Sequence, residues 1–223
     1  MSTWRTVIAI VAKDVASELR SKETLSTLLI FALLIMVVFN FAFELRVENV
    51  RQIAPGVLWV AFTFSGILSL NRSFVVEREE GCIEGLRLTP VDRGAIYLGK
   101  FVGNTLFMLA AEVCILPLFA VLFDVSVLNP TLWLIVVLGT VGFAAVGTLF
   151  AAMTVNTRAR EAMLPLLLFP ITVPVLIAAT KATGQILDGQ PFAEISAWLR
   201  LLVAFDAIFT VIAWLGFEYV LEE

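Results

Sequence analysis

Long apolar runs constrain this chain more than any other feature of its sequence. A membrane-spanning helix needs about 20 mainly apolar residues, and six runs of roughly that length occur here. They cover approximately residues 25–43, 54–71, 101–123, 131–155, 162–180 and 198–221. Because hydrocarbon offers the backbone no water to bond with, such runs must be helical. The sequence therefore predicts an all-α, polytopic membrane protein with six transmembrane helices.

Composition agrees with lipid as the solvent. Of the 223 residues, 60% are hydrophobic and 15% are charged, whereas soluble domains average about 45–50% apolar and about 25% charged residues. The net charge of −4 argues against a nucleic-acid partner, which would need a basic surface. The chain has no histidine, the commonest general base and metal ligand. We therefore expect no metal and no directly bound cofactor.

The distribution of Lys and Arg predicts the orientation. If the N-terminus is cytoplasmic, eleven of these residues lie on the cytoplasmic side and four lie outside. Cytoplasmic loops carry the excess of positive charge in membrane proteins. We therefore expect a multi-pass protein of the cell inner membrane with both termini in the cytoplasm.

The first 24 residues form a separate element within what we expect to be a single transmembrane domain, residues 1–223. Apolar side chains recur on one face of a helix, at Trp4, Val7, Ile8, Val11, Val15 and Leu19. This pattern predicts an interfacial helix that lies in the cytoplasmic membrane surface. The alternative is a helix packed on its neighbours without a role in the membrane plane. Residues 25–223 then form the six-helix bundle.

A compact charged segment, residues 77–100, separates the second and third apolar runs. It reads EREEGCIEGLRLTPVDRGAIYLGK and holds nine charged residues. Gly81 and Gly85 predict a change of chain direction, and Thr89 followed by Pro90 is typical of a helix start. The helix that follows would carry Arg93 and Lys100 to the membrane surface. Apolar residues between charges suit a docking surface, although a solvated connecting loop would look similar.

The candidate docking residues in this segment are Glu77, Arg78, Glu80, Gly81, Ile83, Glu84, Gly85, Leu86, Leu88, Pro90 and Arg93.

Other polar residues occur within or beside the apolar runs. Glu112 lies near the middle of the third run, where an ionised carboxylate is costly. The same argument applies with less force to Asn40 and Asn104. Each has either a functional role or a buried structural hydrogen bond. The glycines of the fourth run, which are Gly139, Gly142 and Gly147, favour close helix packing.

The connection between the fourth and fifth runs carries Arg158, Arg160 and Glu161. These residues either anchor the cytoplasmic end of the helices or form a second contact with a partner. The fifth run also contains Pro165 and Pro170, followed by Pro174. Each proline removes a helix hydrogen bond, so this helix should be kinked or broken.

The charged segment has a recognisable pattern, E-R-E-x-G-x-x-E-G-L-x-L-T-P-x-x-R. It resembles the loop of ABC-2-type transporter permeases, in which a short coupling helix docks on an ATP-hydrolysing subunit. The sequence has no G-x-x-x-x-G-K-[ST] loop of its own. The resemblance therefore implies a non-enzymatic transmembrane subunit and places ATP and its hydrolysis in a partner ATPase.

The run NTRAREAMLPLLLFPITVPVLIA, residues 156–178, is similar to the CcmB family, the permease-like subunits of cytochrome c maturation. The resemblance implies a permease subunit that couples ATP hydrolysis to haem handling or to release of a haem chaperone. It also implies a homodimer, surrounded by membrane lipid, in a complex with a CcmA-like ATPase, CcmC-like and CcmD-like membrane subunits and a CcmE-like haem chaperone.

Three rival functions remain open at the level of sequence. A general ABC-2-type permease that exports a lipid, a polysaccharide or a drug would share the charged segment. A passive scaffold would recruit the ATPase without needing hydrolysis. An intramembrane enzyme would need clustered catalytic residues at membrane depth, and no such cluster is visible in the sequence.

Overall fold

The computed structural model describes residues 3–21, 23–44, 52–79, 92–155, 157 and 159–220, and this part of the chain consists of helices joined by short connections. The helices are α1 (Thr3–Ser21), α2 (Glu23–Glu44), α3 (Ala54–Glu79), α5 (Arg93–Phe123), α6 (Pro130–Thr154), α7 (Arg160–Leu187) and α8 (Phe192–Val220). Six of these are long and apolar enough to cross a membrane, namely α2, α3, α5, α6, α7 and α8. The prediction of an all-α protein with six spans is thus confirmed.

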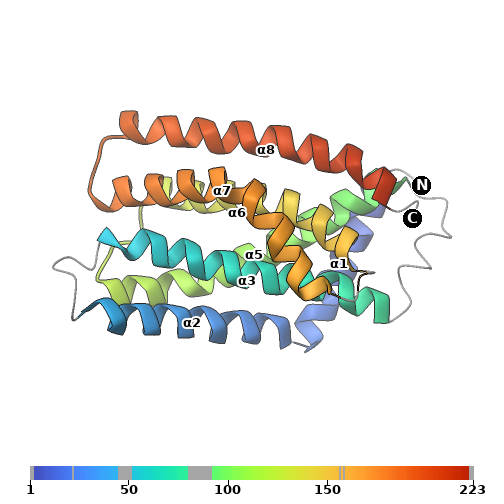
Figure 1. Ribbon diagram of the computed structural model, residues 1–223, viewed down its shortest axis with the longest axis horizontal. Helices are drawn as coiled ribbons and strands as arrows, with labels where there is room; N and C mark the ends of the chain where they lie inside the picture. The colour runs from blue at the N-terminus through green and yellow to red at the C-terminus, as the bar shows by residue number, and fades with distance from the viewer. Residues whose placement is uncertain are drawn as a thin grey trace.

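The six spans lie side by side as an elongated bundle (Figure 1). The helices α3 and α6 are the most deeply buried, and α2 and α8 at the two edges are the least. The outer face of α2 illustrates why a lipid environment is needed, since its exposed side chains are large and apolar: Ile30, Leu33, Leu34, Val38 and Phe41. Such a contiguous apolar surface is rare on soluble proteins.

Small residues let the central helices approach closely. A Cβ atom added at Gly139 of α6 would overlap the indole ring of Trp59 in α3, and one at Gly147 would overlap Leu70. At Gly142 the added atom would overlap the carboxyl group of Asp206 in α8. The prediction that these three glycines serve helix packing is confirmed.

The proline-rich helix is bent but continuous. Pro165, Pro170 and Pro174 all lie inside α7. Figure 1 shows the first half of α7 running obliquely across the bundle before the helix turns parallel to the other spans. The hydroxyl of Thr172 also bonds back to the carbonyl of Leu168, a contact that often accompanies a bend, and neighbouring helices support the bend.

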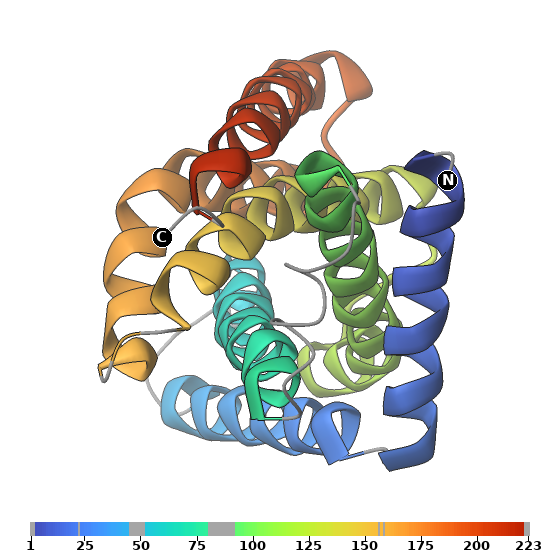
Figure 2. The same ribbon diagram turned by 90° about the vertical axis from the view of Figure 1, so that its right-hand side faces the viewer.

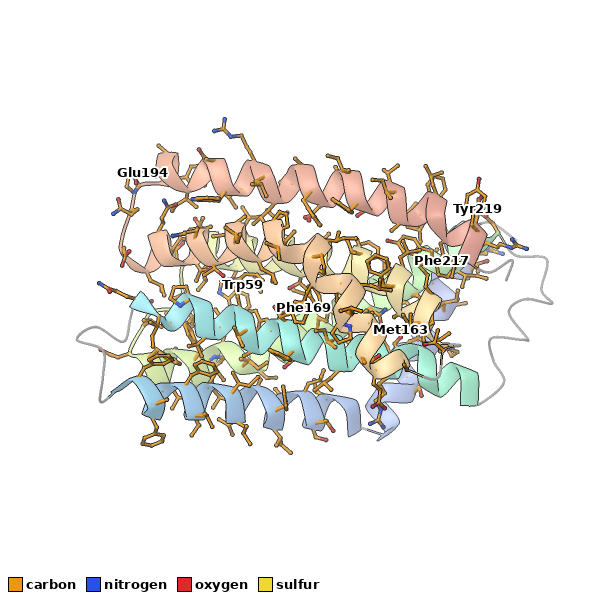
Figure 3. All side chains as sticks on the ribbon, viewed as in Figure 1. Trp59, Met163, Phe169, Glu194, Phe217 and Tyr219 are labelled. Atoms are coloured by element: carbon orange, nitrogen blue, oxygen red, sulfur yellow. The ribbon has the colours of Figure 1, made fainter. Side chains whose placement is uncertain are left out.

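The N-terminal helix runs across the bundle. In Figure 2, α1 is seen side-on while the six spans are viewed close to end-on, so α1 lies nearly perpendicular to them. It lies at the end of the bundle that also holds both chain termini (Figure 1), here called the terminal end. Figure 3 shows Tyr219 of α8 at this end and Glu194 at the opposite end.

The apolar side chains of α1 divide into two groups. Val7 and Ile10 are buried against the bundle, whereas Trp4 and Ile8 are 73% and 64% exposed. One side of α1 therefore packs on protein and an adjacent side presents apolar groups outward. The packing of α1 on its neighbours is thus an observation, and its outward apolar groups are compatible with the predicted interfacial helix.

Candidate functional site

The charged segment between α3 and α5 is only partly described. Glu77 and Arg78 belong to the last turn of α3. The predicted docking residues Glu80, Gly81, Ile83, Glu84, Gly85, Leu86, Leu88 and Pro90 lie outside the described residues. The two helices that flank them, α3 and α5, respectively end and begin at the terminal end of the bundle (Figure 1). The geometry of these flanking helices defines the candidate site.

The helix after the segment begins later than the sequence pattern suggested. Asp92 is the N-cap of α5, and its carboxylate accepts a hydrogen bond from the backbone N–H of Gly94 at 3.2 Å. The prediction that Thr89 caps this helix, with Pro90 in its first turn, is wrong by three residues. A carboxylate is as good a cap as a threonine hydroxyl. The sequence therefore allowed a helix start after either Thr89 or Asp92.

Arg93 ties the start of α5 to the end of α8. Its Nη1 atom donates to the backbone carbonyl of Glu218 at 3.1 Å. The side chain of Trp214 covers Gly94, where an added Cβ atom would overlap the indole nitrogen. Arg93 was predicted as a docking residue, and the structure places it at a contact between two spans.

Two glycines shape the contact between α5 and α1. A Cβ atom at Gly99 would lie 2.9 Å from the side chain of Ile10 in α1, and one at Gly103 would lie 3.9 Å from the Cβ atom of Asp14. Because these glycines are one helical turn apart, they form a shallow groove on α5. The helix α1 lies in this groove.

The same stretch contains a near match to a phosphate-binding loop. Residues 94–101 read GAIYLGKF, which has the glycine and lysine spacing of G-x-x-x-x-G-K-[ST] but ends in Phe101. They lie within the regular helix α5, whereas phosphate binding requires a loop with free backbone N–H groups. In this chain the glycines serve helix packing.

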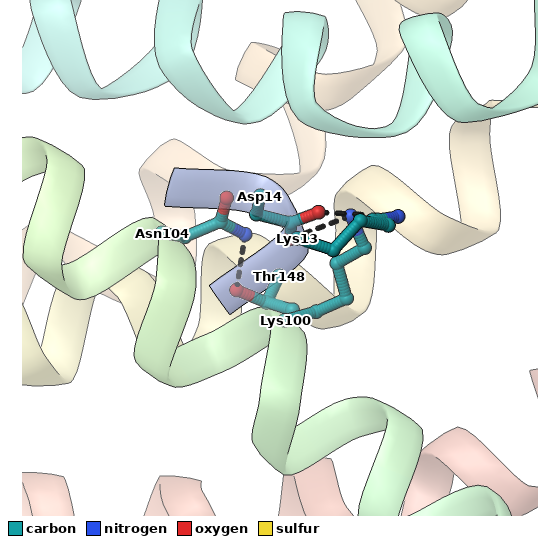
Figure 4. Close-up of polar contacts among 5 residues, drawn as sticks. All are labelled: Lys13, Asp14, Lys100, Asn104 and Thr148. Carbon is teal, nitrogen blue, oxygen red and sulfur yellow. Dashed lines mark hydrogen bonds and ion pairs between the residues drawn. The ribbon is translucent and has the colours of Figure 1, made fainter. Parts of the chain in front are cut away.

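Lys100 lies between these glycines and is buried, with 1% of its surface exposed. Its Nζ atom lies 2.9 Å from Oδ2 of Asp14, whose Oδ1 is 3.2 Å from Nζ of the half-exposed Lys13. The ammonium group also lies 5.6 Å from the centre of the Phe74 ring in α3, within range of a cation–π contact. Figure 4 shows the ion pairs.

Lys100 is therefore buried within the protein, which its place in a charged segment did not predict. Helix α1 crosses the bundle at the level of Lys100 and covers it, and the carboxylate of Asp14 supplies the opposite charge that burial demands. Lys100 is a buried contact among α1, α3 and α5.

Further polar side chains follow Lys100 along the same side of α5. Asn104 donates from Nδ2 to the hydroxyl of Thr148 at 3.0 Å, and Glu112 accepts from the hydroxyl of Thr140 at 2.8 Å to each carboxyl oxygen. Residues four or eight apart share one helix face. Both partners belong to α6, so the predicted intramembrane residues Asn104 and Glu112 lie inside the bundle.

Asn40 makes a comparable contact nearer the far end. Its Nδ2 atom donates to the backbone carbonyl of Leu122 at 2.8 Å and links α2 to α5. All three predicted intramembrane polar residues therefore have hydrogen-bond partners within the bundle.

A small cavity of about 10 Å³ adjoins Glu112. It is lined by Trp59, Phe62, Thr63, Met108, Glu112, Gly139, Thr140, Phe143 and Leu176. A space of this size holds about one water molecule and is far too small for haem. Within the described residues, no three His, Cys, Asp or Glu side chains come together in a way that could hold a metal ion.

The predicted second contact is described in part. Arg158 lies outside the described residues, and so does the side chain of Arg160, which begins α7. Glu161 is exposed in the first turn of α7. Glu161 is therefore placed at the surface beside the terminal end.

Two acidic residues inside the fold, the partly buried Asp14 and the buried Asp206, were not identified from the sequence. Asp14 appears as a polar residue of an amphipathic helix, and only the fold brings it to Lys100. Asp206 lies in α8, is 8% exposed and has no hydrogen-bond partner for either carboxyl oxygen among the described residues. Its position inside the last apolar run is the signal that could have found it.

Comparison with known proteins places this architecture in a family. The CcmB protein family matches residues 5–222. A heme exporter protein B from Pseudomonas aeruginosa is 29% identical over 205 residues, which cover 92% of each chain. The protein of that name from Rhodobacter capsulatus is 31% identical over 183 residues, with 81% of this chain and 84% of the relative covered. Because the family match spans nearly the whole sequence, this chain belongs to the CcmB family.

Proposed function

We propose that this chain is the membrane permease subunit of an ABC-type complex in cytochrome c maturation. Its relatives carry the name heme exporter protein B, and its six spans form a bundle without a soluble catalytic domain among the described residues. ATP is hydrolysed in a partner ATPase, and haem is handled by the complex. The chain itself binds no cofactor.

The observation that carries the coupling role is the convergence of helices at the terminal end. The end of α3 and the start of α5 lie on either side of residues 80–91 (Figure 1), and the buried Lys100 of α5 contacts Phe74 of α3 and pairs with Asp14 of α1. A force on the segment between α3 and α5 would therefore reach three helices at once. Closure of the partner ATPase on ATP supplies that force in this proposal.

The proposal assigns the terminal end to the cytoplasm of a cell with an inner membrane. The excess of Lys and Arg on this side supports the assignment. The partners are a CcmA-like ATPase, CcmC-like and CcmD-like membrane subunits, and a CcmE-like haem chaperone. Two copies of the chain pair with two ATPase subunits.

Purification of the tagged protein in mild detergent, followed by mass spectrometry of the co-purifying chains, tests the proposal. An ABC ATPase together with haem-handling membrane proteins is the expected result. An ATPase without those proteins would favour a general ABC-2-type permease for a lipid, polysaccharide or drug. Repeated purification without any ATPase would refute the coupling role.

A pair of substitutions tests the docking segment within this complex. Gly85→Asp with Leu86→Asp is expected to abolish co-purification of the ATPase and leave membrane insertion intact. Leu128→Asp is a matched control, because Leu128 is 86% exposed in the link between α5 and α6 at the opposite end of the bundle. Equal ATPase recovery from both variants would contradict the docking assignment.

A further inference from the structure

Lys100 of α5 is the point at which α3 and α5 meet the N-terminal helix α1. Its ammonium group pairs with Asp14 of α1 at 2.9 Å and lies over Phe74 of α3 at 5.6 Å. Phe74 lies five residues before the end of α3, and Lys100 lies in the second turn of α5. Elements that are far apart in the sequence therefore share one buried charge.

Burial makes this contact hard to separate. An ammonium group with 1% of its surface exposed is strongly destabilised when it loses its counter-charge. Sliding α1 away from α5 would leave Lys100 without Asp14 and would also open the groove formed by Gly99 and Gly103. The native arrangement therefore favours motions in which these helices keep their contact.

We infer that Lys100 is a positioning residue that makes α1, α3 and α5 move as one body, so that α1 is part of the coupling device. This inference rests on the proposed function, since the motion is the one driven by the partner ATPase. In this mechanism a displacement of the segment between α3 and α5 is passed through Lys100 and Asp14 to the helix in the membrane plane.

The geometry offers a covalent replacement for the ion pair. The Cβ atom of a residue at position 103 would lie 3.9 Å from Cβ of Asp14, which is within the usual range for a disulfide. The test variant combines Asp14→Cys and Gly103→Cys with Lys100→Met, so that no unpaired charge is buried. Cys82→Ser and Cys114→Ala remove the native thiols. The same protein can then be compared with the tether oxidised and reduced.

The readout is hydrogen exchange of the intact purified complex, measured by mass spectrometry. The complex is compared in two states, without nucleotide and after trapping with ATP and vanadate. In the wild type, exchange in α1 is expected to change between the two states by at least about fivefold, the low end of typical coupling between linked sites. The reduced variant should lose this nucleotide response in α1, and the oxidised variant should regain it. Asp14→Glu, which keeps the charge, should retain it.

Hydrogen exchange in residues 80–91 distinguishes a failure of the inference about Lys100 from a failure of the proposed function. If this segment responds to nucleotide while wild-type α1 does not, the inference about Lys100 is overturned and the proposed function stands. A response of α1 that persists in the reduced variant also overturns the inference. A complex that contains no ATPase would overturn the proposed function, and the inference with it.

Discussion

The hydroxyl group of Thr140 lies 2.8 Å from each carboxyl oxygen of Glu112 and joins α6 to α5 inside the membrane bundle. Thr140→Val removes this donor and leaves a buried carboxyl group without a partner, which costs about 1–3 kcal/mol. We expect the variant to unfold at a lower temperature in detergent. The measurement is the temperature at which the heated protein loses its monodisperse peak in size-exclusion chromatography.

Two companions of this variant test the cause. Thr140→Ser keeps the hydroxyl and should behave like the wild type. Glu112→Gln keeps an acceptor for Thr140 and should change the stability by no more than about 1 kcal/mol, the value of one ordinary hydrogen bond. Equal stability of the Val and Ser variants would contradict a structural role for this bond.

Close packing between α3 and α6 predicts a second effect. Gly139→Ala places a methyl group where the ring of Trp59 lies, and overpacking of this kind costs about 1–3 kcal/mol. Gly56→Ala is the matched control, because nothing lies within 4 Å of its added Cβ atom and alanine favours a helix over glycine by roughly 0.5–1 kcal/mol. Thermal unfolding should therefore shift in opposite directions for the two variants.

Trp59 also anchors α3 to α7. Its Nε1 atom donates to the hydroxyl of Thr183 at 3.0 Å, and Figure 3 shows Trp59 between the two helices. Thr183→Val should cost about 1–3 kcal/mol because the indole N–H loses its acceptor. Thr63→Val should cost less, since the Thr63 hydroxyl bonds to the carbonyl of Trp59 within α3 itself. A larger loss of stability for Thr63→Val than for Thr183→Val would argue against this anchor.

The orientation can be read by cysteine labelling of whole cells. In a background of Cys82→Ser and Cys114→Ala, Gln190→Cys places a thiol at the end opposite the termini, and Ala159→Cys places one at the terminal end. Both native residues are exposed. A membrane-impermeant maleimide should label Gln190→Cys in intact cells and Ala159→Cys only after permeabilisation. The reverse pattern would invert the proposed orientation.

The spans could be predicted because length and hydropathy alone decide them. A run of apolar residues long enough to cross a bilayer has no stable alternative to a helix there, and the helices α2 to α8 follow those runs. The bend of α7 was predictable for a similar reason, since proline acts on the backbone of its own helix. These features depend on local sequence.

The buried polar contacts were harder to predict because they depend on which helix faces meet. Lys100 and Asp14 are 86 residues apart, and neither the charge count nor the amphipathic pattern of α1 shows that they touch. The apolar stripe on α1 likewise gave no sign that Val7 would be buried while Trp4 stays exposed. Spacing within one helix identifies a face but leaves open what covers it.

The start of α5 shows the same limit on a smaller scale. Thr89 with Pro90, and Asp92 with Arg93, are both acceptable helix starts. The helix begins at Arg93, where Trp214 covers Gly94 and the carbonyl of Glu218 accepts a bond from the arginine. Contacts with α8, which comes about 120 residues later in the chain, favour one of two locally equivalent choices.

If α1 lies in the membrane surface, as its sequence pattern predicts, its crosswise placement also fixes how deep the protein sits in its bilayer. A helix lying in the membrane surface and clamped to α5 by Asp14 and Lys100 holds the terminal end at a constant height relative to the lipid headgroups. A change in bilayer thickness must then be absorbed at the opposite end, by tilting of the spans or by thinning of the lipid around them. The end that α1 would hold at this height is also where α3 ends and α5 begins, so the proposed docking surface would keep its distance from the membrane whatever lipid surrounds the bundle.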